Sequence, residues 1–183
     1  MRILVTGSAG HLGEGLARVL TAAGHDVAGL DLLPSAFTHR RGDIADRAFV
    51  RDCMRGVDAV VHAATLHKPH VATHSARAFV DTNVTGTLNL LEEAAAAGVS
   101  AFVFTSTTSV FGDAVRPGPG QPAVWATEDL PPRPRDVYGI TKRAAEDLCQ
   151  LVHRRRGLPC VILRTSRFFP DEDDDEAVRR AYA

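Results

Sequence analysis

Short apolar runs alternate with amphipathic segments along most of the chain. The runs predict buried strands over residues 2–5, 27–30, 37–40, 57–61, 99–104 and 160–163. Between them, apolar residues at spacings of three and four predict helices over residues 10–23, 46–54, 75–97 and 137–156. Because parallel strands are joined by right-handed helical crossovers, this order predicts an α/β fold, a doubly wound parallel sheet with helices on both faces.

The stretch from residue 112 to residue 135 interrupts this alternation. It contains six of the ten prolines of the chain, which excludes a long helix or a central strand. A connection of this length inside a compact domain is usually functional, so we expect an active-site loop here. Residues 171–176 form an almost unbroken acidic run, which predicts a solvated surface tail over residues 171–183. The expected organisation is one domain over residues 1–170, followed by this tail.

Composition excludes several classes of protein. The chain has 183 residues, 45% of them apolar, and a formal net charge of −1, which excludes intrinsic disorder and gives no basic field for nucleic acid. No apolar run approaches the roughly 20 residues of a membrane helix, and Gly7 interrupts the first run too early for a secretory signal. Three cysteines at wide spacing argue against a disulfide framework or a zinc cage. We therefore expect a cytoplasmic globular protein that binds neither nucleic acid nor membranes.

Glycines recur at three-residue intervals directly after the first predicted strand. The segment is Gly7-Ser8-Ala9-Gly10-His11-Leu12-Gly13. Without Cβ atoms the backbone can turn sharply and approach a pyrophosphate, whose charge is stabilised by N–H groups and by the dipole of the following helix. The spacing departs from the Gly-x-Gly-x-x-Gly fingerprint of dinucleotide sites. Taken alone, the segment is equally compatible with a turn that binds no ligand.

Asp31 favours the dinucleotide interpretation. It ends the second predicted strand, 18 residues after Gly13, where a carboxylate accepts hydrogen bonds from the ribose hydroxyls of adenosine. The same carboxylate repels a 2′-phosphate, so NAD is favoured over NADP. Arg40 and Arg41 follow closely in the sequence and weaken that preference.

Tyr138 and Lys142 lie four residues apart at the start of the last predicted helix, so they share one face. A phenol with its usual pKa of about 10 is a poor base at neutral pH, and a neighbouring ammonium lowers that pKa. Hydroxyl side chains fill residues 106–109, at the carboxyl end of a predicted strand, where open α/β sheets bind ligands. Both patterns also occur in proteins without a site of this kind. A Tyr/Lys pair at this spacing arises by chance, and a cluster of hydroxyl side chains can simply end a strand.

Five motifs together occur in the order found in the extended short-chain dehydrogenases/reductases. They are Thr6-Gly7-x-x-Gly10-x-x-Gly13, His62-Ala63-Ala64, Asn83-Val84-x-Gly86-Thr87, Ser106-Thr107-x-x-Val110-Phe111-Gly112 and Tyr138-Gly139-x-x-Lys142. Over residues 1–170 the chain resembles the NAD-dependent epimerase/dehydratase branch of that family. The resemblance implies a Rossmann-like NAD-binding domain and a homodimer formed through the helices at 75–97 and 138–156. It also implies hydride transfer at a hydroxyl-bearing carbon of a sugar or nucleotide-sugar-like small molecule.

The resemblance further implies a role for each matching residue. Tyr138 would exchange a proton with the substrate hydroxyl, while Lys142 would bind the nicotinamide ribose and lower the pKa of the tyrosine. Thr107, with Ser106 as the alternative, would bind the reacting oxygen. The residues expected to hold NAD, besides Tyr138 and Lys142, are Gly7, Gly10, His11, Leu12, Gly13, Asp31, Asp43 and Ile44 beside the adenine, Ala63, Ala64, and Asn83, which would hold the backbone near the active site.

Three departures from the family pattern narrow the expected function. Thr108 and Ser109 stand where dehydratases carry an Asp-Glu pair, which counts against a sugar 4,6-dehydratase. Arg167 replaces a substrate-contacting Asn, which counts against a nucleotide sugar but offers a partner for a phosphate or carboxylate. Family members continue past the sixth strand into a region that forms most of the substrate pocket. We therefore expect NAD binding with weak or no turnover from these 183 residues.

Two other functions remain compatible with the same residues. One is a non-catalytic NAD-binding module that senses redox state or serves as a scaffold. The other is a reductase of a small carbonyl compound, which differs only in its substrate.

Four histidines suggest a metal site at first sight. His67, His70 and His74 follow His62, but Pro69 breaks the helical His-x-x-x-His spacing, and no acid or cysteine completes a ligand set. We therefore expect histidines of a surface loop and no metal.

Overall fold

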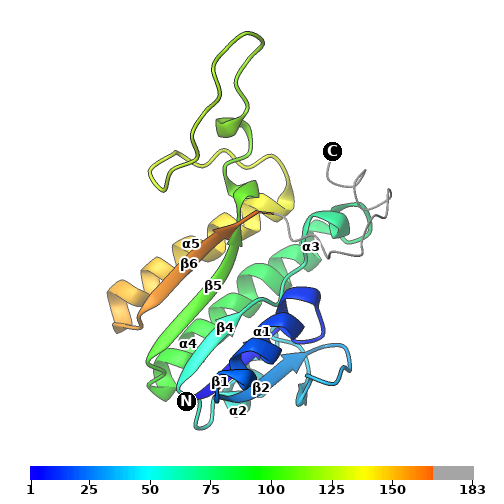
Figure 1. Ribbon diagram of the computed structural model, residues 1–183, viewed down its shortest axis with the longest axis vertical. Helices are drawn as coiled ribbons and strands as arrows, with labels where there is room; N and C mark the ends of the chain where they lie inside the picture. The colour runs from blue at the N-terminus through cyan, green and yellow to red at the C-terminus, as the bar shows by residue number, and fades with distance from the viewer. Residues whose placement is uncertain (167–183) are drawn as a thin grey trace.

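The computed structural model describes residues 1–166 as one six-stranded parallel sheet flanked by helices (Figure 1). The strand order is β3-β2-β1-β4-β5-β6. The strands are β1 (Arg2–Thr6), β2 (Asp26–Asp31), β3 (Arg40–Arg41), β4 (Ala59–His62), β5 (Ala101–Thr107) and β6 (Cys160–Thr165). All five neighbouring pairs are parallel, which confirms the predicted doubly wound α/β fold.

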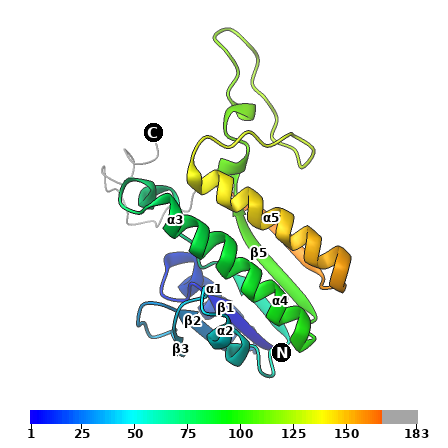
Figure 2. The same ribbon diagram turned by 180° about the vertical axis from the view of Figure 1, so that it is seen from behind.

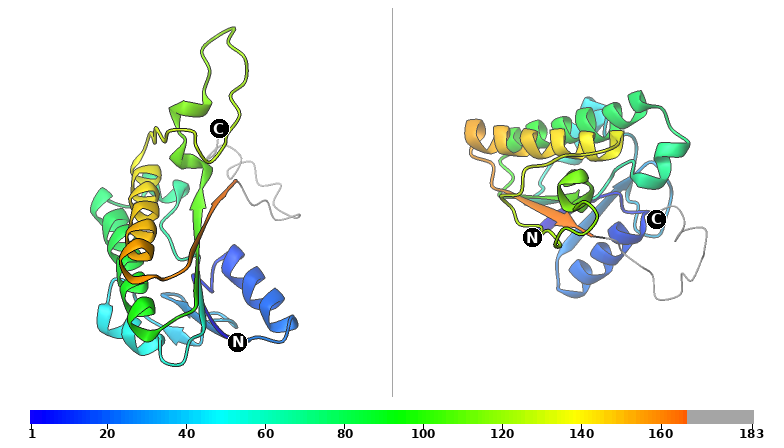
Figure 3. Two further views of the ribbon diagram at one scale, coloured as in Figure 1. Left: turned by 90° about the vertical axis from the view of Figure 1, so that its left-hand side faces the viewer. Right: turned by 90° about the horizontal axis from the view of Figure 1, so that it is seen from above.

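The helices lie in two layers on opposite faces of the sheet. One face carries α1 (His11–Ala22), and the other carries α4 (Thr87–Ala97) and α5 (Val137–Arg156), as Figure 3 shows. Helix α2 (Arg47–Cys53) packs beside α4. Seen from behind, α4 and α5 run side by side across the sheet (Figure 2). Within residues 1–166, none of the helices combines the length and the apolar character needed to span a membrane.

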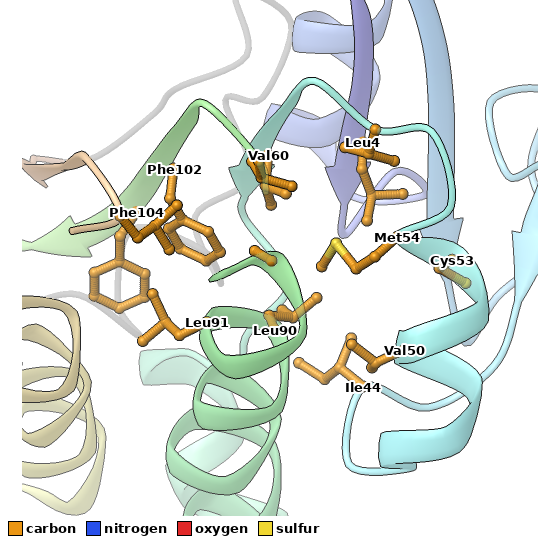
Figure 4. Close-up of a cluster of buried hydrophobic side chains, with 14 of the residues drawn as sticks. Leu4, Ile44, Val50, Cys53, Met54, Val60, Leu90, Leu91, Phe102 and Phe104 are labelled. Carbon is orange, nitrogen blue, oxygen red and sulfur yellow. The ribbon is translucent and has the colours of Figure 1, made fainter. Parts of the chain in front are cut away.

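The main core fills the space between the sheet and the layer of α2, α4 and α5. Leu4, Val60, Phe102 and Phe104 point from the strands toward Leu90 and Leu91 of α4, and toward Val50, Cys53 and Met54 of the α2 segment (Figure 4). These side chains are almost fully buried. At roughly 1.5–3 kcal/mol for each large apolar side chain removed from water, this cluster supplies much of the driving force for folding.

The third strand begins later than the sequence suggests. The predicted strand over residues 37–40 is wrong in its first part, because the Thr38 N–H donates to the Ser35 carbonyl and the Ser35 hydroxyl accepts from the Phe37 N–H. These bonds form a turn, so the chain pairs with β2 only at Arg40 and Arg41.

The predicted uniform helix over residues 75–97 is also modified. Ser75 caps α3 (Ala76–Phe79), the chain continues as a π-helical segment, η2 (Val80–Gly86), and α4 ends at Gly98 in a left-handed conformation. The π-helical turns place Asn83, in the middle of η2, beside the segment that follows β4. A π-helical insertion of this kind often marks a functional position.

The proline-rich loop of residues 112–135 projects from the sheet beyond the end of β5 (Figure 1). Two short 3-10 segments lie at its base: η3 (Thr108–Val110) immediately precedes the loop, and η4 (Asp113–Val115) lies at its start. The base is closed by a bridge between Gly112 and Arg133 and by the hydrogen bond from the Asp113 N–H to the Arg133 carbonyl. The predicted acidic tail over 171–183 lies outside the described residues.

Candidate active site

A cavity of about 960 Å³ opens along the carboxyl ends of the parallel strands. Its lining runs from the ends of β2 and β3, across the start of α1, to the ends of β4, β5 and β6 and the first turns of α5. It brings together nearly all the residues singled out in the sequence: Gly7, Gly10, His11, Leu12, Gly13, Asp31, Asp43, Ile44, Ala63, Ala64, Ser106, Thr107, Tyr138 and Lys142. Asn83 is the exception, because it lies behind the cavity wall.

The glycine-rich turn packs so closely against neighbouring backbone that two of its positions leave no room for a side chain. Gly7 has a φ of +75°, and a Cβ there would lie 2.7 Å from the Ala64 nitrogen. A Cβ on Gly13 would overlap the carbonyl oxygen of Gly7. Gly10, the N-cap of α1, provides no side-chain cap, so the first N–H groups of this helix remain available to an anion.

Asp31 connects β2 to the glycine-rich turn. Its Oδ2 accepts from the Ala9 N–H at 3.0 Å, and its Oδ1 accepts from the Leu33 N–H at 2.9 Å. The carboxylate is thus held in one orientation on the cavity wall, and each oxygen keeps a further lone pair for a ligand hydroxyl. This geometry suits the ribose contact expected from the sequence.

Asp43 and Ile44 form the wall next to Asp31. The Asp43 carboxylate accepts from the Ala45 N–H at 2.8 Å. The buried Asn89 amide of α4 donates to the carbonyls of Ile44 and Ala45, which fixes this loop against the helix layer. Both residues thus line the cavity, and they are held there by Asn89, which the sequence analysis did not identify.

Tyr138 and Lys142 lie on the first turns of α5 and line the end of the cavity away from Asp31. The Asp136 side chain caps this helix by accepting from the Gly139 N–H at 2.8 Å. Lys142 is buried, with Nζ 4.1 Å from the centre of the Phe104 ring. Burial lowers the pKa of Lys142 to about 7, although Cys149 and Glu146 act in the opposite direction. Lys142 is therefore a poorly solvated amine whose charge depends on what binds beside it.

The two candidate hydroxyls, Ser106 and Thr107, are not equivalent. The Ser106 hydroxyl donates to the buried carboxylate of Glu146 at 2.6 Å, so its proton is already engaged. Thr107 accepts from the Ser109 N–H at 3.1 Å, which leaves its own proton available to a ligand in the cavity. The geometry favours Thr107 as the hydroxyl that donates to a reacting oxygen.

Glu146 belongs to a buried ionic cluster that the sequence analysis missed. Arg164 of β6 donates to both of its oxygens, at 3.0 and 2.8 Å, and also to the Glu128 carbonyl of the proline-rich loop. The Arg164 guanidinium lies 4.9 Å from the centre of the Phe111 ring. The Lys-x-x-x-Glu spacing of Lys142 and Glu146 was the available signal, since both must share a helix face.

Asn83 acts behind the cavity rather than in its lining. Its amide donates to the Leu66 carbonyl and to the Thr141 hydroxyl, and its oxygen accepts from the Leu66 N–H. These bonds tie η2, the segment after β4 and α5 together. They match the backbone-holding role that the resemblance implies.

The four histidines occupy different environments, and the expectation of surface histidines is wrong for His62. His62 is fully buried between the hydroxyls of Thr6 and Thr87, at 2.7 and 2.9 Å. Because the Thr87 hydroxyl donates to the Asn83 carbonyl, the Nε2–H of His62 must donate to Thr87, and burial lowers the pKa of this ring.

Two of the other histidines, His67 and His70, are partly buried and line the cavity, and burial lowers the pKa of each. His74 is exposed, as expected. Among the residues that the structure describes, no group of three or more His, Cys, Asp or Glu side chains is arranged to hold a metal ion.

Several cavity residues were missed because no motif contains them. They lie at or after the ends of strands, within the proline-rich loop and at the start of α5. They include Thr65, Leu66, His67, Lys68, His70, Val115, Arg116, Arg135, Asp136, Thr165 and Ser166. The usable signal was topological, since ligands bind beyond the carboxyl ends of parallel strands.

A family model described as the NAD dependent epimerase/dehydratase family matches residues 3–183. The chain belongs to this family. The match spans the glycine-rich turn, Asp31 and the Tyr138–Lys142 pair, so the motifs that suggested the family from the sequence lie in one cavity of the structure.

Curated relatives in this family include both epimerases and dehydratases. The chain is 34% identical to a UDP-glucose 4-epimerase of Streptomyces lividans over 158 residues, which are 80% of this chain and 46% of the relative. It is 34% identical to a dTDP-glucose 4,6-dehydratase of Streptomyces niveus over 191 residues, covering 93% of this chain and 55% of the relative. The chain spans about half the length of the curated relatives it matches.

Solved structures of the family share the fold. A short-chain dehydrogenase/reductase superfamily protein from Agrobacterium tumefaciens with bound NAD superposes with a TM-score of 0.83 at 34% identity, covering 98% of this chain and 55% of that one. The Thermus thermophilus UDP-glucose 4-epimerase in complex with NAD gives a TM-score of 0.78 at 32% identity, covering 90% and 54%. The family assignment thus rests on sequence and on fold.

Proposed function

We propose that this chain binds NAD and provides the cofactor and acid–base half of an epimerase site acting on a nucleotide-sugar-like substrate. One observation carries the proposal: a single cavity connects Asp31, the uncapped start of α1 and the Tyr138–Lys142 pair. Its polar groups occur in the order in which a dinucleotide presents ribose, pyrophosphate and reactive ring.

The residues present fit NAD. The start of α1 borders the cavity and has no side-chain cap, so its N–H groups would hold a pyrophosphate, and Asp31 would accept hydrogen bonds from the adenosine ribose. Arg41 donates to the Leu32 carbonyl at 3.0 Å, so its guanidinium is partly engaged beside Asp31. This arrangement favours NAD over NADP. When bound, NAD supplies a ring that accepts a hydride and returns it.

The side chains at the other end perform the acid–base chemistry. Tyr138, as the phenolate, takes the proton of the substrate hydroxyl while the hydride leaves the same carbon, and it gives the proton back when the hydride returns. Lys142 stabilises the phenolate and binds the nicotinamide ribose. Thr107 donates a hydrogen bond to the reacting oxygen as it becomes a carbonyl oxygen. With bound NAD supplying the hydride chemistry, these three side chains would move the proton and hold the oxygen during epimerisation.

Epimerisation is favoured over dehydration by the acids that the described cavity contains. Asp31 and Asp43 lie at the end proposed for adenosine, and the Asp136 carboxylate caps α5. Thr108 and Ser109, next to Thr107, are not acids. Removing water from a sugar requires a general acid near the reacting carbon, and none of these three is placed for it.

The proposal is tested by separating binding from chemistry. The chain is titrated with NAD⁺ by calorimetry, then incubated with UDP-glucose while NADH absorbance and formation of the 4-epimer are followed over long times. We expect NAD⁺ to bind with micromolar affinity and turnover to be slow, since these residues span half of their relatives. Tyr138→Phe should bind NAD⁺ within a few-fold of wild type and form neither NADH nor epimer.

The control is Thr21→Val, which removes an exposed hydroxyl on α1 outside the cavity lining and should behave as wild type. Undiminished product formation by Tyr138→Phe would exclude the phenol as the acid–base group. Tight NAD⁺ binding with no product from the wild type would instead favour a non-catalytic NAD-binding module.

A further inference from the structure

The charges that line the cavity are unevenly distributed. Among the residues that the structure describes, three acids line the cavity, and two of them, Asp31 and Asp43, lie at the ends of β2 and β3, where the proposed function places adenosine. Within residues 1–166, the lysines and arginines of the lining lie over β4, β5, β6 and α5: Lys68, Arg116, Arg135 and Lys142. The basic lining residues therefore lie at the end of the cavity away from Asp31 and Asp43, and which of them could bind a substrate depends on what each already contacts.

Asp136, the third acid, does little to offset this charge. Its Oδ1 accepts from the Gly139 N–H and caps α5, so the carboxylate is directed at the positive end of the helix dipole. The basic character of this half of the cavity remains.

The four basic side chains differ in the groups that they already contact. Lys142 lies over Phe104 and beside Tyr138, in the position proposed for the nicotinamide ribose. Lys68 lies in the segment that follows β4, and its side chain is already engaged with another group. Neither is placed to select the substrate.

Arg116 differs from Arg135 in its pairing. Arg135 forms an ion pair with Asp113 at 2.9 Å, which compensates its charge. The Arg116 side chain, at the end of η4, has no hydrogen bond or ion pair within residues 1–166, and it is exposed to the cavity from the base of the proline-rich loop. It is the basic side chain in the substrate half that is left for a ligand.

We propose that Arg116 binds an anionic group of the substrate, so that the site selects a negatively charged sugar derivative over a neutral sugar. The inference rests on the proposed function, since NAD must fill the other half of the cavity. A guanidinium pairs with the two oxygens of a carboxylate or phosphate through parallel hydrogen bonds. The group is either a carboxylate on the sugar ring or the diphosphate of a nucleotide sugar.

The test uses the full 183-residue chain saturated with NAD⁺. Wild type, Arg116→Gln and Arg133→Gln are each titrated by calorimetry with UDP-glucose, glucuronate and glucose. Arg133 is the matched control, because it is an exposed arginine at the same loop base that does not line the cavity. We expect one of the two anions to bind the wild type, and Arg116→Gln to weaken that binding by about 10- to 100-fold. Arg133→Gln should leave it unchanged.

The outcomes distinguish a diphosphate from a ring carboxylate as the bound group. They also distinguish failure of this inference from failure of the proposed function. Arg116-dependent binding of UDP-glucose identifies the diphosphate, and Arg116-dependent binding of glucuronate identifies the ring carboxylate. Equal affinity of wild type and Arg116→Gln, glucose binding as tightly as the anions, or no anion binding at all would overturn this inference. Failure of the wild type to bind NAD⁺ before any sugar is added would instead overturn the proposed function.

Discussion

Asp31 has a structural role, and we propose that the same carboxylate binds the adenosine ribose. Its two hydrogen bonds, from the Ala9 and Leu33 N–H groups, hold the glycine-rich turn against the end of β2. The same oxygens face the cavity where a ribose would lie. A substitution there removes the ligand contact and loosens the turn that receives the pyrophosphate.

We therefore expect Asp31→Ala to lower the affinity for NAD⁺ by about 10- to 100-fold, the effect of losing charge-assisted hydrogen bonds. Calorimetric titration measures this directly. The control is Asp26→Ala, at the other end of β2, where the exposed carboxylate only approaches Arg2 at 3.8 Å. Equal NAD⁺ affinity of Asp31→Ala and Asp26→Ala would remove Asp31 from the site.

Lys142 makes the stability of the ligand-free protein depend on pH. Its pKa is about 7 in the folded chain against an ordinary value of 10.5, mainly because it is buried. Between these two values the unfolded chain binds a proton that the folded chain does not, so the free energy of unfolding rises with pH across this window. Below pH 7 the full cost of burying the ammonium is present.

Lys142→Met should remove this dependence. We expect the variant to gain stability relative to wild type at pH 6 and to lose most of that advantage by pH 10, a difference of about 2–4 kcal/mol at 1.36 kcal/mol per pKa unit. Urea unfolding of both proteins without NAD, at several pH values, gives the comparison. Parallel stability curves for the two proteins would mean that Lys142 does not titrate in this range.

At the scale of single elements, α1 tests whether the shape of the glycine-rich turn matters. Gly13 and Gly15 both lie on this helix, but a Cβ on Gly13 would overlap the Gly7 carbonyl oxygen, whereas a Cβ on Gly15 meets nothing within 4 Å. The same substitution therefore has opposite expected effects two residues apart.

Gly15→Ala should stabilise the protein by about 0.5–1 kcal/mol, because alanine is the better helix former, and should leave NAD⁺ affinity unchanged. Gly13→Ala should cost about 1–3 kcal/mol and lower NAD⁺ affinity at least ten-fold, since the turn must open to admit the methyl group. Thermal unfolding and NAD⁺ titration of the pair provide the measurement. Similar behaviour of both variants would show that the close approach at Gly13 is unimportant.

The elements also show where sequence patterns reach their limit. The helical spacing and the glycine that follows it predicted α5 correctly. The helix spans 137–156 and ends at Gly157, which has a left-handed conformation. The π-helical turns of η2 have no local signal, because the helical periodicity of 75–97 continues through them. They are set by hydrogen bonds from Asn83 to Leu66, a residue 17 positions away in the chain.

The same contrast applies to the site. Motifs predicted the residues at both ends of the cavity, since glycines, Asp31 and the Tyr138–Lys142 pair have recognisable spacing. Glu146, Arg164 and Arg116 were missed, because their significance depends on contacts between α5, β6 and the proline-rich loop. Such contacts exist only once the sheet has formed.

At the scale of the whole molecule, the predicted homodimer can be tested on the outer face of α4 and α5. Ile140 of α5 is 55% exposed and Val80 of η2 is 42% exposed, both in the helix layer that the resemblance assigns to the interface. Ile140→Glu should leave the circular dichroism spectrum unchanged and shift sedimentation from dimer to monomer. Glu14→Gln, on the opposite face of the sheet, serves as the control. A monomeric wild type would contradict the dimer.

The central claim is that one cavity holds NAD with its adenosine at Asp31 and its nicotinamide at Tyr138. The most direct test is a crystal structure of the 183-residue chain grown with NAD⁺. The account predicts ribose hydroxyls within hydrogen-bond distance of the Asp31 carboxylate, the pyrophosphate against the first turn of α1, and the nicotinamide ribose beside Lys142. A dinucleotide bound elsewhere, bound in the reverse direction, or lying away from Tyr138 would contradict it.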